Sequence, residues 1–261
     1  MAELELTKHH GLGNDFLVAF DPQVDDLAAL ARRLCDRRRG IGADGLLIGA
    51  SESGYAARMV LYNSDGSRAE MSGNGIRCFA QALARRRGDT DAQQILTDAG
   101  DRLVTLYTTK DPDVLDAGVD MGEVTVLAQP SGWHLVGSDP MRPVRHLGVG
   151  NPHAVVLVDD VAVVDLLTLG EMVPNINLEV VEAGPEATAI TMRVHERGAG
   201  ITQACGTGAC AAAWAASSWG LVDEQAPEIT VHMDGGDAKV RLHDPMKGHC
   251  TLVGPAVFVG S

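Results

Sequence analysis

The stretch Cys205-Gly-Thr-Gly-Ala-Cys210 opens an alanine-rich run, and Ser72-Gly-Asn-Gly-Ile-Arg-Cys78 opens a similar run 133 positions earlier. Each run has the composition of a helix and stops at a glycine, Gly88 in the first case and Gly220 in the second. Glycine is favoured just after the last turn of a helix. Small residues on every side of a helix are typical of one buried with a sheet close around it. The two stretches therefore predict two buried helices, each at the centre of an α/β unit.

Other features of the chain recur at nearly the same spacing. Asn63 and Glu196 also lie 133 positions apart, and each follows a short run of strand type. Gly13-Asn14 and Gly150-Asn151 lie 137 positions apart, and each precedes an apolar run. Features that recur in the same order at a fixed offset indicate an internal duplication. We therefore expect two homologous halves that meet near residues 110–118.

The apolar runs outside the two helices are short and rich in β-branched residues, which is typical of strands. Asp234-Gly-Gly-Asp237 lies between two such runs and predicts a hairpin turn. The chain is thus of the α/β (α+β) class. We place the N-terminal domain at residues 1–112, completed by a returning strand at 252–261, and the C-terminal domain at residues 113–251.

Composition excludes several classes of protein. The chain has 261 residues with 21 Lys and Arg against 35 Asp and Glu, so its net charge of −14 argues against a nucleic-acid binder. It begins without the basic and apolar segments of a secretory signal, and no apolar run approaches the roughly 18–20 residues of a membrane helix. Five cysteines at irregular spacing fit free thiols in a reducing compartment. These features predict a cytoplasmic protein that binds neither nucleic acid nor membrane.

The glycine motifs have the form of anion-binding sites. A polar residue followed by Gly-x-Gly at a helix start leaves backbone N–H groups free to bind an anion. Two such starts could hold one small anionic ligand. Nucleotide sites are not indicated, because the chain lacks a phosphate loop of the NTPase type and His10-Gly-Leu-Gly-Asn-Asp-Phe16 lacks the third glycine of a dinucleotide fingerprint. The spacing of His and Cys matches no zinc motif, so we do not expect a zinc site.

Cys205 is the residue most indicative of chemistry. At the N-terminus of a helix a thiol is expected to have a lowered pKa, and its thiolate can act as a nucleophile or a general base. The alternative is a buried and inert cysteine, as we assume for Cys35, Cys78 and Cys210. His153 is the histidine that we place near the chemistry, although its spacing is equally compatible with a structural role.

Around these residues the sequence resembles the diaminopimelate epimerase family, whose members are amino-acid racemases that use no cofactor. The similarity extends over nearly the whole chain in the order of the family. The matching segments are His10-Gly-Leu-Gly-Asn-Asp-Phe16, Gly42-Ala-Asp-Gly45, Asn63-Ser-Asp-Gly-Ser67, Met71-Ser-Gly-Asn-Gly-Ile-Arg-Cys78, Gly150-Asn-Pro-His153, Asn175-Ile-Asn177, Glu196-Arg-Gly-Ala-Gly200 and Ala204-Cys-Gly-Thr-Gly208.

The resemblance implies two pseudo-symmetric domains, each a mixed and mainly antiparallel sheet wrapped around a central helix, which close on a substrate between them. It also implies conversion of LL-2,6-diaminopimelate to the meso form for lysine and peptidoglycan precursors. One base removes the α-proton from one face while an acid on the other face returns a proton, without pyridoxal phosphate or metal. A homodimer is the family expectation.

The resemblance also implies roles for individual residues. The catalytic positions are Cys205 and Ser72, and beside the reacting amine and the bases lie Glu196 and His153. The reacting carboxylate is held by Gly73, Asn74, Gly206 and Thr207. The distal, non-reacting end is held by Asn14, Asn63, Asn151, Asn177 and Arg197, with Gly45 also among the substrate-binding residues.

Ser72 departs from the family, which has cysteine at the first catalytic position. A hydroxyl is a far weaker acid than a thiol, so serine is a poor proton donor and its alkoxide is inaccessible at neutral pH. The residue could be an engineered inactivating change, a natural variant with slower proton delivery, or the mark of a one-base reaction. Two other hypotheses therefore stand beside the epimerase: a related racemase or dehydratase acting on another amino acid, and a catalytically inactive amino-acid-binding protein.

Overall fold

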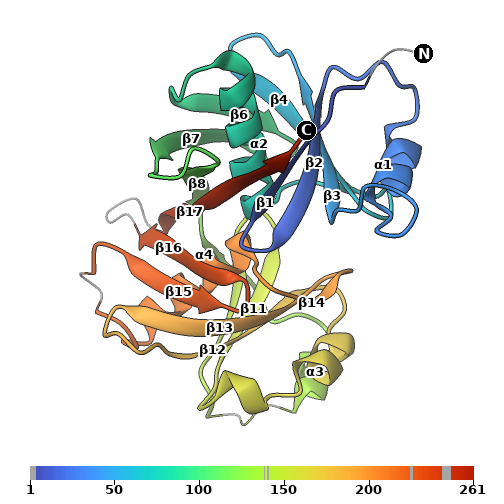
Figure 1. The fold of residues 1–261 in the computed structure, drawn as a ribbon. Coiled ribbons are helices and arrows are strands. Elements are labelled where there is room, and N and C mark those ends of the chain that lie inside the picture. The colour runs from blue at the N-terminus through green and yellow to red at the C-terminus, as the bar shows by residue number, and fades with distance from the viewer. Residues whose placement is uncertain (1–3, 138, 140, 224–225, 243–247) are drawn as a thin grey trace. The chain divides into compact units, whose positions relative to one another are not determined.

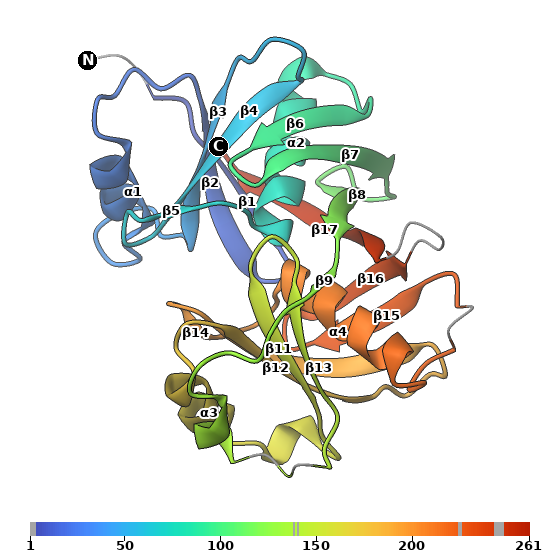
Figure 2. The same cartoon turned by 180° about the vertical axis from the view of Figure 1, so that it is seen from behind.

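The chain divides into two compact units in the structure, a computed structural model that describes residues 4–137, 139, 141–223, 226–242 and 248–261. Unit 1 comprises Met1–Asp120 and Gly254–Ser261, and unit 2 comprises Met121–Val253. Figures 1 and 2 show the elements of each unit from opposite sides. No helix in the described ranges is both long and apolar enough to cross a membrane.

Unit 1 is a mixed sheet that closes on itself. Strand β17 pairs with both β1 and β8, and the remaining strands connect β1 to β8 through neighbouring pairs. The pairs β2–β3 and β4–β6 are parallel, whereas β1 pairs antiparallel with β2 and β17, β3 with β4, β4 with β5, β6 with β7 and β7 with β8. The elements are β1 (Thr7–Gly11), β2 (Asn14–Phe20), α1 (Leu27–Cys35), β3 (Gly45–Ala50), β4 (Ala57–Asn63), β5 (Arg68–Ala69), α2 (Gly73–Arg87), β6 (Gln93–Thr97), β7 (Gly100–Thr108), β8 (Val114–Glu123) and the second part of β17 (His249–Gly260).

Helix α2 occupies the centre of unit 1, as the composition of its sequence predicts. It begins after Ser72 and ends at Gly88, whose φ of 76° lies in the left-handed region that glycine tolerates. All of its residues from Gly73 to Ala84 are buried, and the helix contacts β1, β2 and β7 (Figure 1). The small side chains of this helix allow the strands to approach it closely.

Unit 2 repeats the pairing pattern of unit 1. Its parallel pairs are β11–β12 and β13–β15, which correspond in order to β2–β3 and β4–β6, so the predicted duplication is confirmed. The hairpin predicted at Asp234-Gly-Gly-Asp237 joins β15 to β16. The elements are β9 (Thr125–Val126), η1 (Trp133–Val136), β10 (Val144–Gly148), β11 (Pro152–Leu157), η2 (Val161–Val163), α3 (Leu166–Met172), β12 (Asn177–Ala183), β13 (Ala189–Glu196), β14 (Gly200–Thr202), α4 (Gly206–Ser218), β15 (Ile229–Met233), β16 (Gly236–Leu242) and the first part of β17.

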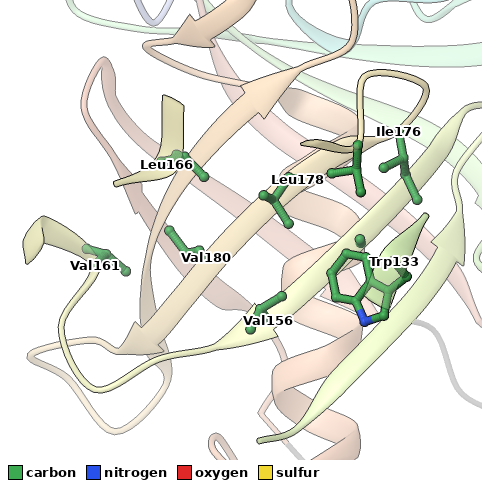
Figure 3. Packing of buried hydrophobic residues seen from close by; sticks show 9 residues of the cluster. Trp133, Val156, Val161, Leu166, Ile176, Leu178 and Val180 are labelled. Carbon is green, nitrogen blue, oxygen red and sulfur yellow. The ribbon is translucent and has the colours of Figure 1, made fainter. Parts of the chain in front are cut away.

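Strands β11 and β12 have different partners on their two faces. On one face Val156 and Leu178 pack with Trp133 in an apolar cluster (Figure 3). Successive side chains of a strand point to opposite faces, so His153 and Glu179 lie on the other face. That face is the one toward α4, which contacts both strands. Two polar residues are therefore buried beside the second central helix.

We expected the two halves to meet near residues 110–118, where Lys110-Asp-Pro-Asp113 has the composition of a turn. That turn joins β7 to β8 inside unit 1. The units divide between Asp120 and Met121, part-way along β8. Turn-forming residues mark a reversal of the chain whether or not a domain ends there, so the sequence signal was real but its interpretation was wrong.

Candidate active site

Ser72 caps the N-terminus of α2. Its backbone is extended (φ −141°, ψ 122°) and its Oγ accepts a hydrogen bond from the N–H of Gly75 at 3.0 Å. Serine is among the preferred residues at this position because its side chain satisfies one of the N–H groups that lack an intrahelical acceptor. The first turn of α2, including Gly73 and Asn74, therefore presents backbone donors of the kind that bind an anion.

A chain of hydrogen bonds holds the polar side chains near this helix start. Asn74 Nδ2 donates to Asn14 Oδ1 at 3.2 Å, and Asn14 Nδ2 donates to Asp44 Oδ2 at 2.7 Å. From the other side, the fully buried Arg77 donates to Asn74 Oδ1 at 2.8 Å and to the carbonyl of Gly73 at 3.0 Å. The structure thus brings Asn14 and Asn74 together and fixes the orientation of both amides.

Two other predicted residues of unit 1 lie at the ends of neighbouring strands. Gly45 at the start of β3 is paired in register with Asn63 at the end of β4. The Asn63 amide donates to Ser67 Oγ at 3.0 Å, so this side chain is held by its own turn. A side chain at position 45 would lie 2.9 Å from the carbonyl oxygen of Tyr62, which explains why glycine occupies it.

Cys205 occupies the same place in unit 2 that Ser72 occupies in unit 1. It caps α4, and its Sγ lies 3.4 Å from both the N–H of Gly208 and the hydroxyl of Thr207. The thiol is buried, with 4% of the residue exposed. Burial, followed by the negative charges of Glu196 and Glu179, raises the pKa of Cys205 well above its ordinary value. The prediction of a lowered pKa is therefore wrong, because desolvation and two carboxylates outweigh the helix N-terminus.

Glu196, at the end of β13, is near this thiol, and its negative charge is one cause of the raised pKa of Cys205. Its Oε1 accepts a hydrogen bond from Thr202 Oγ1 at 2.5 Å. Burial, and next the charge of Glu179, raise the pKa of Glu196 above the usual range. A thiol and a carboxylate whose proton affinities are both raised can pass a proton between them when the charge in the site changes.

His153 lies next to this pair and is fully buried. Its Nδ1 is 2.6 Å from Oε1 of Glu179, and its Nε2 is 2.7 Å from Oδ1 of Asn151. The structure therefore brings His153 and Asn151 together and adds Glu179, a buried carboxylate that we did not predict. The first turn of α4 lies against the same carboxylate, since a side chain at Gly208 would meet Glu179 Oε1 at 2.7 Å.

Asn177 and Arg197 lie on adjacent strand ends of unit 2. Asn177 is buried, its Oδ1 accepts from the backbone N–H of Arg197 at 2.8 Å, and its Nδ2 donates to the carbonyl of Pro152 at 3.1 Å. The side chain of Arg197 is exposed. Its guanidinium is thus available for a ligand, while its backbone is fixed by Asn177.

Sequence reasoning missed three polar residues of these sites. Glu179 stands inside the largely apolar run of β12, and Arg77 stands in the buried part of α2, where it is the one charged residue from Gly73 to Ala84. A charge within a segment predicted to be buried was an available signal for both. Thr202, which binds Glu196, follows a short loop and had no such signal.

Replacement of Glu196 by glutamine is expected to lower the pKa of the Cys205 thiol. The carboxylate disfavours the thiolate, and a neutral amide of the same shape removes that repulsion, so more thiolate is present at any given pH. Titration of the ultraviolet thiolate absorbance, with the spectrum of Cys205→Ser subtracted, measures the change. Glu186→Gln, at an exposed ion pair with His232, is the matched control. Ionisation of Cys205 at the same pH in Glu196→Gln and the parent protein would contradict the assignment.

Within the described parts of the chain, no group of three or more His, Cys, Asp or Glu side chains is placed to hold a metal ion. A buried helix lies within the sheet of each unit, and the helix of unit 2 begins at a thiol with a carboxylate nearby. The family match and the relatives below make the protein an isomerase of the epimerase class. The family model for diaminopimelate epimerase matches residues 6–127 and 146–259, and the chain belongs to that family.

Proteins named diaminopimelate epimerase are similar to this chain over nearly their whole length. The diaminopimelate epimerase of Thermosynechococcus vestitus is 39% identical, covering 99% of this chain and 98% of the relative. That of Desulfitobacterium hafniense is 36% identical, with 98% and 96% covered.

Solved structures with lower sequence identity share the fold. A predicted epimerase from Pseudomonas aeruginosa has a TM-score of 0.77 at 15% identity, covering 99% of this chain and 98% of that one. A phenazine biosynthesis protein of the PhzF family from Bacillus anthracis has a TM-score of 0.75 at 15% identity, with 98% and 97% covered. The predicted α+β class with a sheet around a central helix is confirmed.

Proposed function

We propose that the protein inverts the α-carbon of LL-2,6-diaminopimelate to give the meso isomer, by removal of the α-proton on one face and delivery of a proton on the other. The observation that carries this proposal is the Cys205–Glu196 pair at the start of α4, in a chain that matches the family over nearly its whole length. The reaction supplies precursors of lysine and peptidoglycan.

Cys205 is the acid and base of one face in this proposal. Burial and the charges of the neighbouring carboxylates keep the proton on this thiol. The ammonium group of an amino-acid substrate would offset those negative charges and favour the thiolate, so ionisation is coupled to binding. In this proposal Glu196 receives the thiol proton and binds the ammonium, which its raised pKa and its effect on the pKa of Cys205 support.

The reacting carboxylate binds the backbone donors of the two helix starts, at Gly73 and Asn74 and at Gly206 and Thr207. These donors stabilise the negative charge that develops on the carboxylate as the α-carbon loses its proton. Such stabilisation replaces the electron sink that a cofactor supplies in other racemases, so the proposed reaction needs none.

The distal end of the substrate binds Asn14, Asn63, Asn151, Asn177 and Arg197, with Gly45 beside them. The exposed Arg197 guanidinium can pair with the distal carboxylate in a planar, two-bond arrangement. A substrate with a single carboxylate would make fewer hydrogen bonds with these residues and no ion pair with Arg197, which disfavours it. The set therefore supports a diamino diacid over a simple amino acid.

In the proposed two-base reaction, Ser72 is the poorer of the two proton carriers. Its Oγ accepts from Gly75 and has no thiol chemistry to offer, so we propose that delivery of a proton on its face limits the rate. We also propose that the protein works in the cytoplasm as a homodimer and binds neither nucleic acid nor membrane. The composition and the family resemblance support these proposals.

Incubation of the protein with LL- or meso-diaminopimelate in D2O, followed by mass and chiral analysis, tests the function. The expected result is incorporation of α-deuterium with inversion, and incorporation is expected to exceed inversion because Cys205 is the stronger of the two proton carriers. Exchange without inversion would show that Cys205 acts alone. Binding without exchange would favour an inactive amino-acid-binding protein, and turnover of a monocarboxylic amino acid would favour a different racemase or dehydratase.

A further inference from the structure

Arg77 is a buried cation on α2 to which the proposed reaction assigns no role. It lies in the second turn of the helix and is fully buried. Two glycines on neighbouring strands leave room for its guanidinium, since a Cβ atom at Gly11 of β1 would lie 3.1 Å from Nη2 and one at Gly254 of β17 would lie 3.2 Å from Cζ. Burial of a charge is costly unless hydrogen bonds compensate it, so its contacts show what holds it there.

The guanidinium donates to acceptors at the start of α2 and on β17. Nη1 donates to the carbonyl oxygen of Gly73 at 3.0 Å, Nη2 to Oδ1 of Asn74 at 2.8 Å, and Nε to the carbonyl oxygen of Pro255 at 3.3 Å. The fork of the two terminal nitrogens therefore ties the Asn74 side chain to the backbone of the same helical turn. The third contact anchors the fork to β17.

These contacts settle the orientation of the Asn74 amide. An arginine side chain can only donate, so the atom of Asn74 that faces Nη2 is its oxygen, and its NH2 group donates to Oδ1 of Asn14 at 3.2 Å. The Asn14 amide is oriented in the same sense from its other end. Its Nδ2 donates at 2.7 Å to Oδ2 of Asp44, a carboxylate oxygen that also accepts from a backbone N–H. The hydrogen bonds thus run in one direction, from Arg77 to Asp44.

We propose that Arg77 is a positioning residue for the reacting carboxylate of the substrate, because it holds the first turn of α2 and the Asn74 amide in the arrangement that binds it. This role rests on the proposed function, in which Gly73 and Asn74 bind that carboxylate. Since the side chain of Arg77 is fully buried, it acts through these two residues and not by contact with the substrate.

The charge of Arg77 acts in the same direction as its geometry. The oxygens of Gly73, Asn74 and Pro255 are neutral, so these contacts hold the guanidinium without cancelling its charge. A positive charge behind the first turn adds to the partial positive charge of the helix N-terminus. The carboxylate becomes more negative as the α-carbon loses its proton, so both effects stabilise the transition state more than the bound substrate.

Arg77→Met tests this role, because methionine is unbranched and apolar and removes both the fork and the charge. Its kcat for epimerisation is expected to fall about 10²-fold, the effect of a small misplacement of groups in an active site. KM is expected to change less, because the distal end of the substrate keeps its partners. Arg77→Lys keeps a charge and a donor but not the fork, so its kcat is expected to lie between those of Arg77→Met and the parent protein.

Gln81→Met is the matched control for a merely structural effect. Gln81 lies one turn further along the same face of α2, is also buried, and donates to the carbonyl oxygen of Asp113 at 2.9 Å. Its replacement removes a buried polar side chain from the helix without touching the first turn, so kcat is expected to stay that of the parent protein. If Arg77→Met fails to fold, Arg77→Lys takes its place in the comparison with Gln81→Met.

The orientation of Asn74 can be measured without turnover. In 1H–15N spectra of the unliganded protein, its side-chain NH2 signals are expected to shift in Arg77→Met and to stay in place in Gln81→Met. Asn74→Asp, which has no side-chain NH2 group, assigns these signals.

Three results would overturn the inference: Asn74 signals that do not shift in Arg77→Met, a kcat of that variant equal to that of the parent protein, or an equal loss of kcat in Gln81→Met. Each of them leaves the proposed function standing if the parent protein epimerises diaminopimelate. A parent protein without turnover would contradict the proposed function instead, and a shift of the Asn74 signals in Arg77→Met would then still support the positioning of Asn74 by Arg77.

Discussion

Replacement of Cys205 by alanine is expected to abolish both epimerisation and α-proton exchange, with rates about 10²–10⁴-fold below those of the parent protein. The thiol is the one strong proton carrier of the two helix starts, because Ser72 occupies the other. Loss of Cys205 therefore removes exchange on its own face and leaves no base to begin the reaction on the other face. Proton NMR of LL- and meso-diaminopimelate in D2O, started from each isomer separately, measures both rates.

The variant is also expected to bind diaminopimelate, because the amides and the guanidinium assigned to the distal end remain. Calorimetry separates this outcome from unfolding. Cys210→Ala is the matched control, since Cys210 lies on the same helix and is also fully buried, but is not part of the site. Retention of full epimerisation by Cys205→Ala would exclude the proposed mechanism, whatever the binding result.

Replacement of Ser72 by cysteine is expected to raise kcat for epimerisation about 10²-fold or more. A thiol can give and take a proton near neutral pH, which a hydroxyl cannot. The new side chain would occupy the N-cap of α2, and Cys205 shows that this fold accommodates a cysteine at the equivalent position of α4. The substitution is therefore expected to preserve the structure.

The ratio of inversion to α-deuterium incorporation is the informative measurement for this variant. It is expected to rise in Ser72→Cys, because delivery of a proton on the second face ceases to limit the reaction. Ser72→Thr, which keeps a hydroxyl, is the control and is expected to show no such gain. If Ser72→Cys and the parent protein inverted the substrate equally fast, the residue at position 72 would not limit the reaction, and another group would have to deliver the second proton.

Much of the fold could be predicted from local sequence. The glycine after the last turn of α2 and the Asp234-Gly-Gly-Asp237 turn act through contacts close in the chain, and the small residues of α4 are a local signal of a buried helix. The recurrence of motifs 133 to 137 positions apart also predicted that the two halves have the same fold. The domain boundary was harder, because the turn at Lys110–Asp113 has the same composition whether it joins two domains or two strands of one sheet.

The site was predicted less completely, because its electrostatics depend on pairings between distant strands. The parallel register of β11 and β12 places Glu179 beside His153, and the sequence spacing of the two residues carries no sign of this. For the same reason the pKa of Cys205 was predicted in the wrong direction. Its position at a helix start is a local feature, whereas its burial and the two carboxylates that raise its pKa come from the tertiary structure.

Strand β17 has a consequence for the order in which the protein can fold. Unit 1 is built from both ends of the chain, and its sheet closes only when residues 254–260 pair with β1 and β8. During synthesis on the ribosome, β1 and β8 lack their partner strand β17 until the whole of unit 2 has been synthesised. Unit 1 is therefore synthesised first but completed last. Although the two units share a topology, unit 1 has unpaired strands, and so a risk of aggregation, for longer than unit 2.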